Sequence, residues 1–408
     1  MEAVEARLLL SASSQPAATT PVDVLSYHGS TLDSLGVNNQ ETQLTPGNIT
    51  PSTFGLNFAT NITDTPNLDG IPTSTLNTSI SYTAPDGQAY GEPLVKTGVT
   101  ITTGQYAGTV HDVVYVANEL GSLFAIDANG GGVLWKDSFI YNAGGNPNPL
   151  NATIPDGTTA IPGGYNTETN SQDISPWICI VGTPVIDPSS NSLYLITNTR
   201  YVPGGASGDQ KNPHYIYAIH KINLSNGQDT PSVFADTTLG YSNPSAPTYT
   251  YNSGPYVVGT GSGAVTVSGQ SRIYFNAVRQ MVRPALEILN GRIYMDSASH
   301  GDNQPYHGWV ITFDESSLAI NGVFCTTPSG VEGGIWSGGD GPVFDSQGNF
   351  YVETGNGTFD GNFTTTNGVT TYTGINAQGF PNKGDYGDCF IKLSLDPTTT
   401  VTNPSING

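Results

Sequence analysis

The chain has 408 residues, of which only 11% are charged, and its formal net charge is −21. Such an acidic surface repels nucleic acid and anionic membranes, so neither is expected as a partner. The 50 glycines, 28 prolines and 10% aromatic residues fit many short strands joined by tight turns, and no long helical periodicity interrupts them. The composition therefore predicts an all-β protein with a large core.

Residues 1–23 are predicted to be a disordered leader. Its apolar triplet, Leu8 to Leu10, is shorter than a transmembrane segment or the apolar part of a signal peptide. Residues 4–12 nevertheless resemble a motif of the form LEPR-xLL-SA near the N-termini of large exported bacterial proteins, although Val4 and Ala6 depart from its Leu and Pro. The resemblance implies an exported protein, extracellular or at the cell surface. A chance match within a disordered leader is the alternative.

The 27 residues of Val113–Phe139 contain three strand-like runs separated by two turns. The runs are residues 113–116, 123–126 and 133–135, and the second turn, residues 129–132, has the sequence NGGG, which tolerates positive φ. Three strands with one apolar face cannot close a core alone. The unit is therefore expected to stack against copies of itself.

Four copies align on a proline that opens the first strand, a tyrosine in the second, and an aspartate or asparagine that ends the third. In chain order these landmarks are Pro93, Tyr115 and Asp127; Pro184, Tyr194 and Asn223; Pro284, Tyr294 and Asp314; and Pro342, Tyr351 and Asp396. The copies predict four blades of a β-propeller, at about residues 85–140, 177–237, 284–326 and 336–396.

The turn before Trp135 resembles the signature of a known type of repeat. Residues 125–135, AIDANGGGVLW, resemble the Ala-x-Asp-x-x-x-Gly-x-x-x-Trp signature of pyrroloquinoline quinone (PQQ) repeats. The resemblance implies a quinoprotein alcohol dehydrogenase-like propeller, in which Trp135 docks between neighbouring blades and Asp127 accepts turn amides. The later copies, at residues 219–227 and 311–318, keep the strand and turn but lack the Trp.

The resemblance also bears on the organisation of the chain. Residues 24–84 resemble the closing segment and linker before the first blade, and Leu44–Ile49 matches its Leu-Thr-Pro-x-Asn-Val element. Residues 85–408 would then form a propeller that is truncated at its C-terminus, since the family has eight blades. A small closed ring of four blades is the alternative. The inserts at 141–176, 200–213, 238–270 and 358–384 are either functional loops or surface decoration.

Asn356 is the first candidate for a metal ligand. It lies in the segment Gly341–Asp360, which resembles the dehydrogenase blade in which an asparagine oxygen binds calcium. A calcium ion needs six to eight oxygen ligands, so one amide does not make a site. A strand-end turn whose Gly-Asn-Gly tolerates unusual φ is the alternative.

Asp302 and Asn303 are the second candidates for metal ligands. They occupy the place of the calcium-binding Glu of the dehydrogenases, in the segment Ser299–Phe313, but neither is that Glu, and His307 stands where the family has Arg. An exposed Asp-Asn turn with a nearby pair of surface histidines, His300 and His307, is the simpler interpretation.

Trp177 is the candidate for a cofactor contact, because it could stack on a planar ligand. Many of these dehydrogenases carry two adjacent cysteines nearby, but here Ile178 precedes Cys179, so that disulfide cannot form. A core or rim Trp is the alternative. No general base is assigned. Cys179, Cys325 and Cys389 allow one disulfide, or they are buried free thiols.

These observations leave two functions from different classes. The favoured one is an exported or cell-surface propeller that binds a protein or glycan through its loops. The alternative is a PQQ- and calcium-dependent alcohol or sugar dehydrogenase, an oxidoreductase. Motifs of serine hydrolases, zinc proteases and nucleotide-binding enzymes are absent from the sequence.

Overall fold

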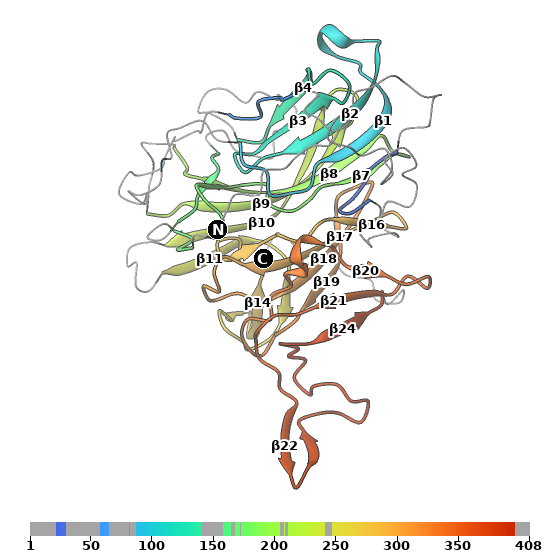
Figure 1. The fold of residues 1–408 in the computed structure, drawn as a ribbon. Coiled ribbons are helices and arrows are strands. Elements are labelled where there is room, and N and C mark those ends of the chain that lie inside the picture. The colour runs from blue at the N-terminus through green and yellow to red at the C-terminus, as the bar shows by residue number, and fades with distance from the viewer. Residues whose placement is uncertain are drawn as a thin grey trace.

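The computed structural model describes residues 22–29, 58–64, 81, 87–140, 158–164, 168–171, 173–204, 208, 211–240 and 247–395. The predicted leader motif, the Leu44–Ile49 element and the landmark Asp396 lie outside these residues. The described residues form a β-propeller whose four antiparallel blades follow one another in chain order (Figure 1). The predicted all-β class and the four blades are confirmed.

The blades have the following strands. Blade one contains β1 (Leu94–Thr100), β2 (Val110–Ala117), β3 (Ser122–Asp127) and β4 (Val133–Ser138). Blade two contains β7 (Val185–Asp187), β8 (Ser192–Tyr201), β9 (His214–Asn223), β10 (Asp229–Gly240) and β11 (Thr248–Ser253). Blade three contains β15 (Gln280–Met281), β16 (Glu287–Leu289), β17 (Arg292–Ser299), β18 (Trp309–Asp314) and β19 (Ile320–Cys325). Blade four contains β20 (Val343–Phe344), β21 (Phe350–Glu353) and β24 (Phe390–Leu393).

Smaller elements lie in the connections between blades or between strands of one blade. They are β5 (Ile161–Pro162) with β6 (Trp177–Ile178); the sheet of β12 (Tyr256–Val258), β14 (Gln270–Tyr274) and β13 (Val265–Val267); the hairpin of β22 (Asn362–Thr366) and β23 (Val369–Thr373); and two 3₁₀ turns, η2 (Gly104–Tyr106) and η4 (Ser337–Gly339). The β22–β23 hairpin projects away from the blades (Figure 1).

Alternating side chains on each central strand contact different neighbours, because successive residues of a strand point to opposite faces. On β8, Leu193 and Leu195 belong to the core between blades one and two. Tyr194 and Ile196 belong to the core between blades two and three. This alternation explains why β8 is buried along nearly its whole length.

Trp135 docks between blades, as predicted. Its indole Nε1 donates a hydrogen bond to the Leu224 carbonyl of blade two at 3.0 Å, and its ring covers Gly227, where a Cβ would collide with it. The Tyr115 hydroxyl donates to the same carbonyl at 3.0 Å. Asp127 accepts the amide of Asn129, as its turn requires.

The described residues of the pre-blade segment lie against blade one. Val24 pairs with Val95 on the free edge of β1, and Phe58 and Ile62 pack on the outer face of the blade. Closure of a ring by residues 24–84 therefore stays a prediction. All three cysteines are free, Cys179 and Cys325 being buried, in agreement with the free-thiol interpretation.

Candidate functional site

The polar residues singled out in blades three and four lie in loops that meet at Glu332. Asp302 and Asn303 are in the loop between β17 and β18, Glu332 is in the connection from β19 to β20, and Asn356 follows β21. We define the Glu332 cluster by the residues that bond to one another around this glutamate, namely Ser262, Gln304, His307, Thr327, Glu332 and Asn356.

Two amide side chains hold the Glu332 carboxylate. Gln304 Nε2 donates to Oε1 at 2.7 Å, and Asn356 Nδ2 donates to Oε2 at 3.0 Å. The Glu332 backbone has a φ of 64°, a left-handed conformation that costs energy for a residue with a side chain. Thr327 Oγ1, which donates to the Glu332 carbonyl at 2.6 Å, helps to stabilise this conformation.

His307 is a buried member of the Glu332 cluster. It and His300 are 2% and 0% exposed, so the expectation of two surface histidines was wrong. His307 Nε2 bonds to the Ser262 carbonyl at 2.9 Å and its Nδ1 lies 2.8 Å from Thr327 Oγ1. Burial lowers the pKa of His307, so the ring is neutral at pH 7. The imidazole is thus a fixed structural link between loops.

Glycines let the loops of the cluster approach backbone to backbone. A Cβ on Gly357 would collide with the backbone of Gly333, and one on Gly387 would collide with the carbonyl of Gly357. Hydrogen bonds between main chains cross the same gap, from Gly333 to Asn356 at 2.8 Å and from Gly387 to Thr358 at 2.8 Å. These close contacts and hydrogen bonds therefore fix the loops of the cluster relative to one another.

The other predicted metal ligands have structural partners. Asp302 is exposed, and its Oδ1 accepts the Tyr306 hydroxyl at 2.7 Å. Asn303 Nδ2 donates to the carbonyls of His300 and Asn170 at 2.9 and 3.0 Å, which ties the insert before β6 to blade three. The structure thus places Asn356 in the cluster and Asp302 and Asn303 in the loop that supplies Gln304. Their role as metal ligands stays a prediction.

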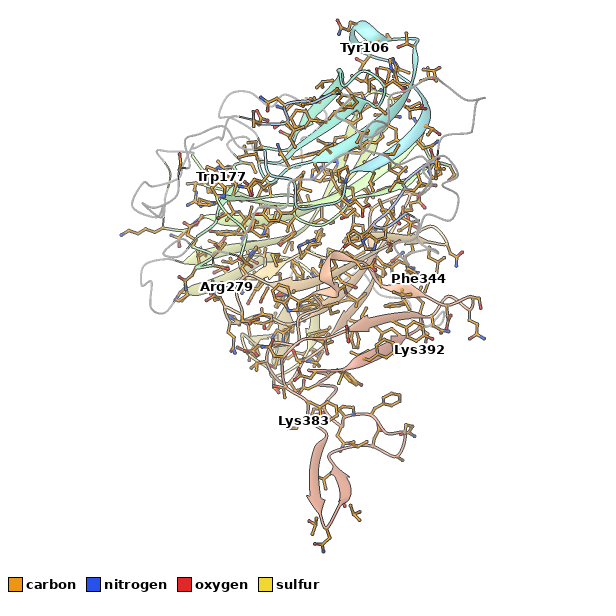
Figure 2. The ribbon with its side chains drawn as sticks, viewed as in Figure 1. Tyr106, Trp177, Arg279, Phe344, Lys383 and Lys392 are labelled. Carbon is orange, nitrogen blue, oxygen red and sulfur yellow. The ribbon has the colours of Figure 1, made fainter. Side chains whose placement is uncertain are left out.

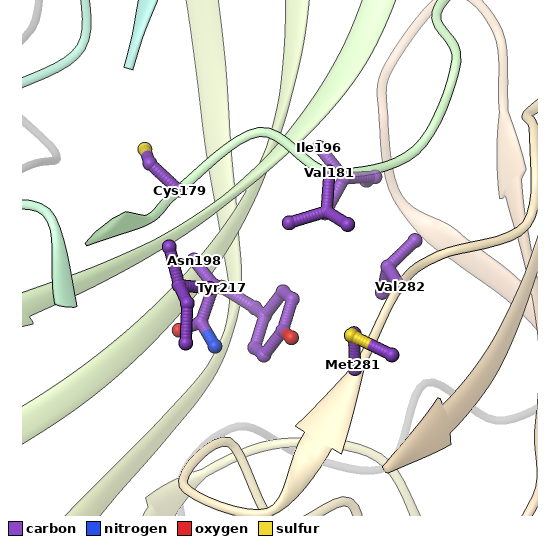
Figure 3. Close-up of a pocket in the computed structure, with 8 residues that line it drawn as sticks. Cys179, Val181, Ile196, Asn198, Tyr217, Met281 and Val282 are labelled. Carbon is purple, nitrogen blue, oxygen red and sulfur yellow. The ribbon is translucent and has the colours of Figure 1, made fainter. Parts of the chain in front are cut away.

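Trp177 lies apart from the cluster, in the core between blades one and two. Its side chain is 0% exposed, and β6 pairs it with Pro162. The neighbouring Ile178 and Cys179 line a cavity of about 10 Å³, which holds one water molecule at most. Figure 3 shows the Tyr217 ring and Asn198 on one side of this cavity and Met281 and Val282 on the other. A planar cofactor on Trp177, which stays a prediction, would require this packing to open.

The donor set of the cluster does not fit a calcium ion as it is arranged. The Glu332 carboxylate and the side-chain oxygens of Asn356 and Gln304 are fewer than the six to eight oxygen ligands that calcium needs. Within the described part of the chain, no group of three or more His, Cys, Asp or Glu side chains is placed to hold a metal ion. The side chains of the cluster alone therefore do not complete a calcium site.

Sequence reasoning did not single out Glu332 or Gln304. The available signal was a lone glutamate between glycine-rich turns, in the stretch SGVEGG. Such a residue is ordinary in a surface loop, and its partners lie 28 and 24 residues away along the chain. Only the fold brings the three loops together.

Comparisons with known proteins identify no family for this chain and give structural matches of low similarity. No model of a known protein family matches the sequence, and no curated protein matches it. Among solved structures, the quinohemoprotein alcohol dehydrogenase from Comamonas testosteroni aligns with a TM-score of 0.32 and 10% identity over 66% of this chain and 30% of its own. A europium-containing methanol dehydrogenase gives 0.27 and 11% over 65% of this chain and 38% of its own.

BamB from Moraxella catarrhalis gives a TM-score of 0.19 and 9% identity over 66% of this chain and 75% of its own. This chain spans well under half of the length of the two dehydrogenases. The propeller assignment therefore rests on the four sheets and on the repeated contacts between them. In the described residues no helix is long and apolar enough to cross a membrane.

Proposed function

We propose that this protein is a recognition module that binds a protein or glycan through the loops of its propeller, with the Glu332 cluster in the contact surface. The observation that carries the proposal is the Glu332 carboxylate held between the amides of Gln304 and Asn356, which come from different loops. Side chains that are fixed before binding lose little conformational entropy when a ligand arrives.

The chemistry of the cluster suits a ligand with many hydrogen-bonding groups. Gln304, Asn356 and the adjacent Asp302 are exposed and offer amide and carboxylate groups, while Glu332 is half-buried. Each carboxylate oxygen has more than one lone-pair direction, so Glu332 can accept a ligand hydroxyl or amide in addition to its internal partners. Sugar hydroxyls and peptide amides both present such donors.

Several observations weigh against the alternative, a PQQ- and calcium-dependent dehydrogenase. The side chains of the Glu332 cluster offer fewer oxygens than calcium needs, Trp177 is buried, and Ile178 stands where the family has the first cysteine of its adjacent pair. We also propose an exported or cell-surface location, supported by the resemblance of residues 4–12 to the motif of exported proteins.

Binding of the full chain to arrays of glycans and of extracellular proteins tests the proposal. Once a ligand is found, Glu332→Gln and Asn356→Ala are expected to weaken binding by roughly tenfold or more, since a hydrogen bond to a charged group contributes about 1.5–3 kcal/mol. Asp236→Asn is the matched control, because Asp236 is a surface carboxylate that also accepts an amide, from Asn252 at 3.0 Å, but on blade two.

Two results would overturn the proposal. One is a ligand whose affinity is the same for wild type, Glu332→Gln and Asn356→Ala. The other is stabilisation by PQQ that requires calcium and disappears in Asn356→Ala, which would favour the dehydrogenase instead.

A further inference from the structure

The small sheet of β12, β14 and β13 presents one of its two sides to solvent. Its inner side chains, Val257 and Ile273, pack against the core between blades two and three. Paired residues of antiparallel strands point to the same side, so the register fixes which side chains lie on the outer side. We define the tyrosine–arginine face by these outer side chains and the β11 tyrosine that stacks on them, namely Tyr251, Tyr256, Val258, Val265, Arg272 and Tyr274. Val258 is 62% exposed and the others are half-buried.

The tyrosine–arginine face lies beside blades two and three. Tyr251 belongs to β11 of blade two, and β12 contacts β19 of blade three. Each of these two blades packs against another blade on both sides. Arg279 anchors β11, since its Nε donates to the Tyr249 hydroxyl at 2.8 Å, and Figure 2 shows Arg279 on the opposite side of the view from Phe344 and Lys392 of blade four.

The side chains of the tyrosine–arginine face hold one another in place. The rings of Tyr251 and Tyr274 are parallel within 10°, with their centroids 4.9 Å apart, and the Arg272 guanidinium lies 4.2 Å from the centre of the Tyr256 ring. Arg272 Nε donates to Gln270 Oε1 at 3.0 Å and its Nη1 donates to the Tyr274 hydroxyl at 3.3 Å. Side chains that are fixed in this way lose little conformational entropy when a partner binds.

A protein suits this face better than a glycan does. A sugar ring binds on the free side of an aromatic ring, whereas one side of each of these three tyrosine rings is already covered by a neighbour. Val258 and Val265 offer a sugar hydroxyl no hydrogen bond. Tyr and Arg, in contrast, are the side chains that dominate the centres of protein interfaces.

The surrounding sequence indicates the charge of the partner. Residues 237–286 contain three arginines and five of the 21 tyrosines but no Asp, Glu or Lys, in a chain that has 33 acidic residues. Asp, Glu and Lys are the residues that protein interfaces lack. Within the described part of the chain Arg272 forms no ion pair, so its guanidinium can accept a carboxylate from a partner.

The tyrosine–arginine face adjoins the Glu332 cluster. Ser262, in the connection from β12 to β13, is a member of the cluster: its carbonyl oxygen lies 2.9 Å from His307 Nε2, and its amide donates to the Gly330 carbonyl at 2.9 Å. A specific interface covers about 800 Å² on each partner, which requires more than the side chains of this face. We propose, building on the function proposed above, that the face and the cluster form one interface, and that the partner is a protein whose contacting segment combines apolar side chains with a carboxylate that pairs with Arg272.

Selection of random peptides displayed on phage against the full chain tests this proposal. The enriched peptides are expected to carry Asp or Glu beside aromatic or aliphatic residues. For a synthetic peptide of this kind, titration calorimetry should show a dissociation constant that rises at least about tenfold in Arg272→Gln and in Val258→Asp. Val258 is exposed, so its substitution leaves the core intact, and an unchanged urea midpoint checks that both variants fold. Lys392→Gln is the matched control, because this lysine is 49% exposed on blade four, and its affinity should equal that of wild type.

Charge reversal tests the predicted ion pair directly. Arg272→Glu should abolish binding of the acidic peptide, and a peptide with Lys in place of its acidic residue should bind this variant. Enriched peptides that lack Asp and Glu would overturn the proposal, as would equal enrichment on wild type and Arg272→Glu, or equal affinities of wild type, Arg272→Gln and Val258→Asp.

The cluster variants separate this proposal from the function proposed above. A ligand, peptide or glycan, that Glu332→Gln weakens and that Arg272→Gln and Val258→Asp do not would leave the function intact and overturn the role of the face. Peptide binding that depends on Arg272 and Val258 but not on Glu332 would support the face and remove the cluster from the interface.

Discussion

Blades two and four carry the same lysine and tyrosine pair in different surroundings. In blade two the pair is covered by blade three and Tyr194 contacts Glu315, whereas in blade four Tyr351 donates to Asp345 of its own blade at 3.0 Å and the face is open. The comparison teaches that the repeat encodes a face suited to a neighbour, and that the neighbour decides whether this face is core or surface.

The ion pairs of blades two and four also differ in how deeply they are buried. Blade two buries Arg200 against Glu168, with side chains 1% and 3% exposed, and buries His220 against Asp229. The Lys392 and Asp345 pair of blade four is 3.1 Å apart, with side chains 49% and 26% exposed. A buried charge is costly unless it is paired, so the loss of one partner should have a large effect only in blade two.

The largest effect is expected for Arg200→Met. Glu168 accepts Arg200 Nε at 2.7 Å and Nη2 at 2.9 Å and also accepts the Tyr215 hydroxyl. Removal of the guanidinium leaves a buried carboxylate without its cation and should lower the free energy of unfolding by about 3–5 kcal/mol, measured by urea denaturation. The double variant Glu168→Leu with Arg200→Met should recover most of the loss. A loss below about 1 kcal/mol would show that the pair is not desolvated.

A second prediction compares one position in two blades. Two residues after the landmark tyrosine, blade three has Asp296, which is 0% exposed and has no hydrogen-bond partner among the described residues, and blade four has the exposed Glu353. Burial raises the pKa of Asp296 to about 8. Between the unfolded pKa near 4 and this value, the native state keeps a proton that the unfolded chain releases.

Stability should therefore fall as the pH rises from about 4 to about 8, with a slope of at most about 1.4 kcal/mol per pH unit from this group. Asp296→Asn should be more stable than wild type at pH 8 and should reduce the slope, whereas Glu353→Gln should do neither. Asp137, whose pKa burial and Asp229 raise to about 7, leaves some pH dependence in the variant. An Asp296→Asn profile that runs parallel to wild type would contradict the assignment.

The fold was predictable from the sequence where its signals are local. The alternation around Tyr115 and the Asp-x-x-x-Gly turn before Trp135 each lie within a few residues, and together they predict the blade and the docking of Trp135. Strand positions within the long inserts were not predictable, because Thr, Asn and Tyr suit both loops and strands.

The candidate site was predictable only in part. Asn356 was singled out, but its partner Glu332 was not, because their approach depends on backbone contacts between glycine-rich loops. Trp177, in contrast, was singled out but is a core residue. Its local sequence fits a ligand contact as well as a core position, and only the packing around it shows that the ring is buried. Local patterns reveal strands and turns, whereas sites depend on which loops meet.

The smallest effect is expected for the lysines that the two blades share. Lys221→Met removes a cation held over Tyr194 beside Glu315 and should cost about 1 kcal/mol. Lys392→Met removes the same contact from a face that is exposed to solvent and should leave the urea midpoint unchanged within error. Equal losses in the two variants would mean that the covering blade adds nothing to the pair.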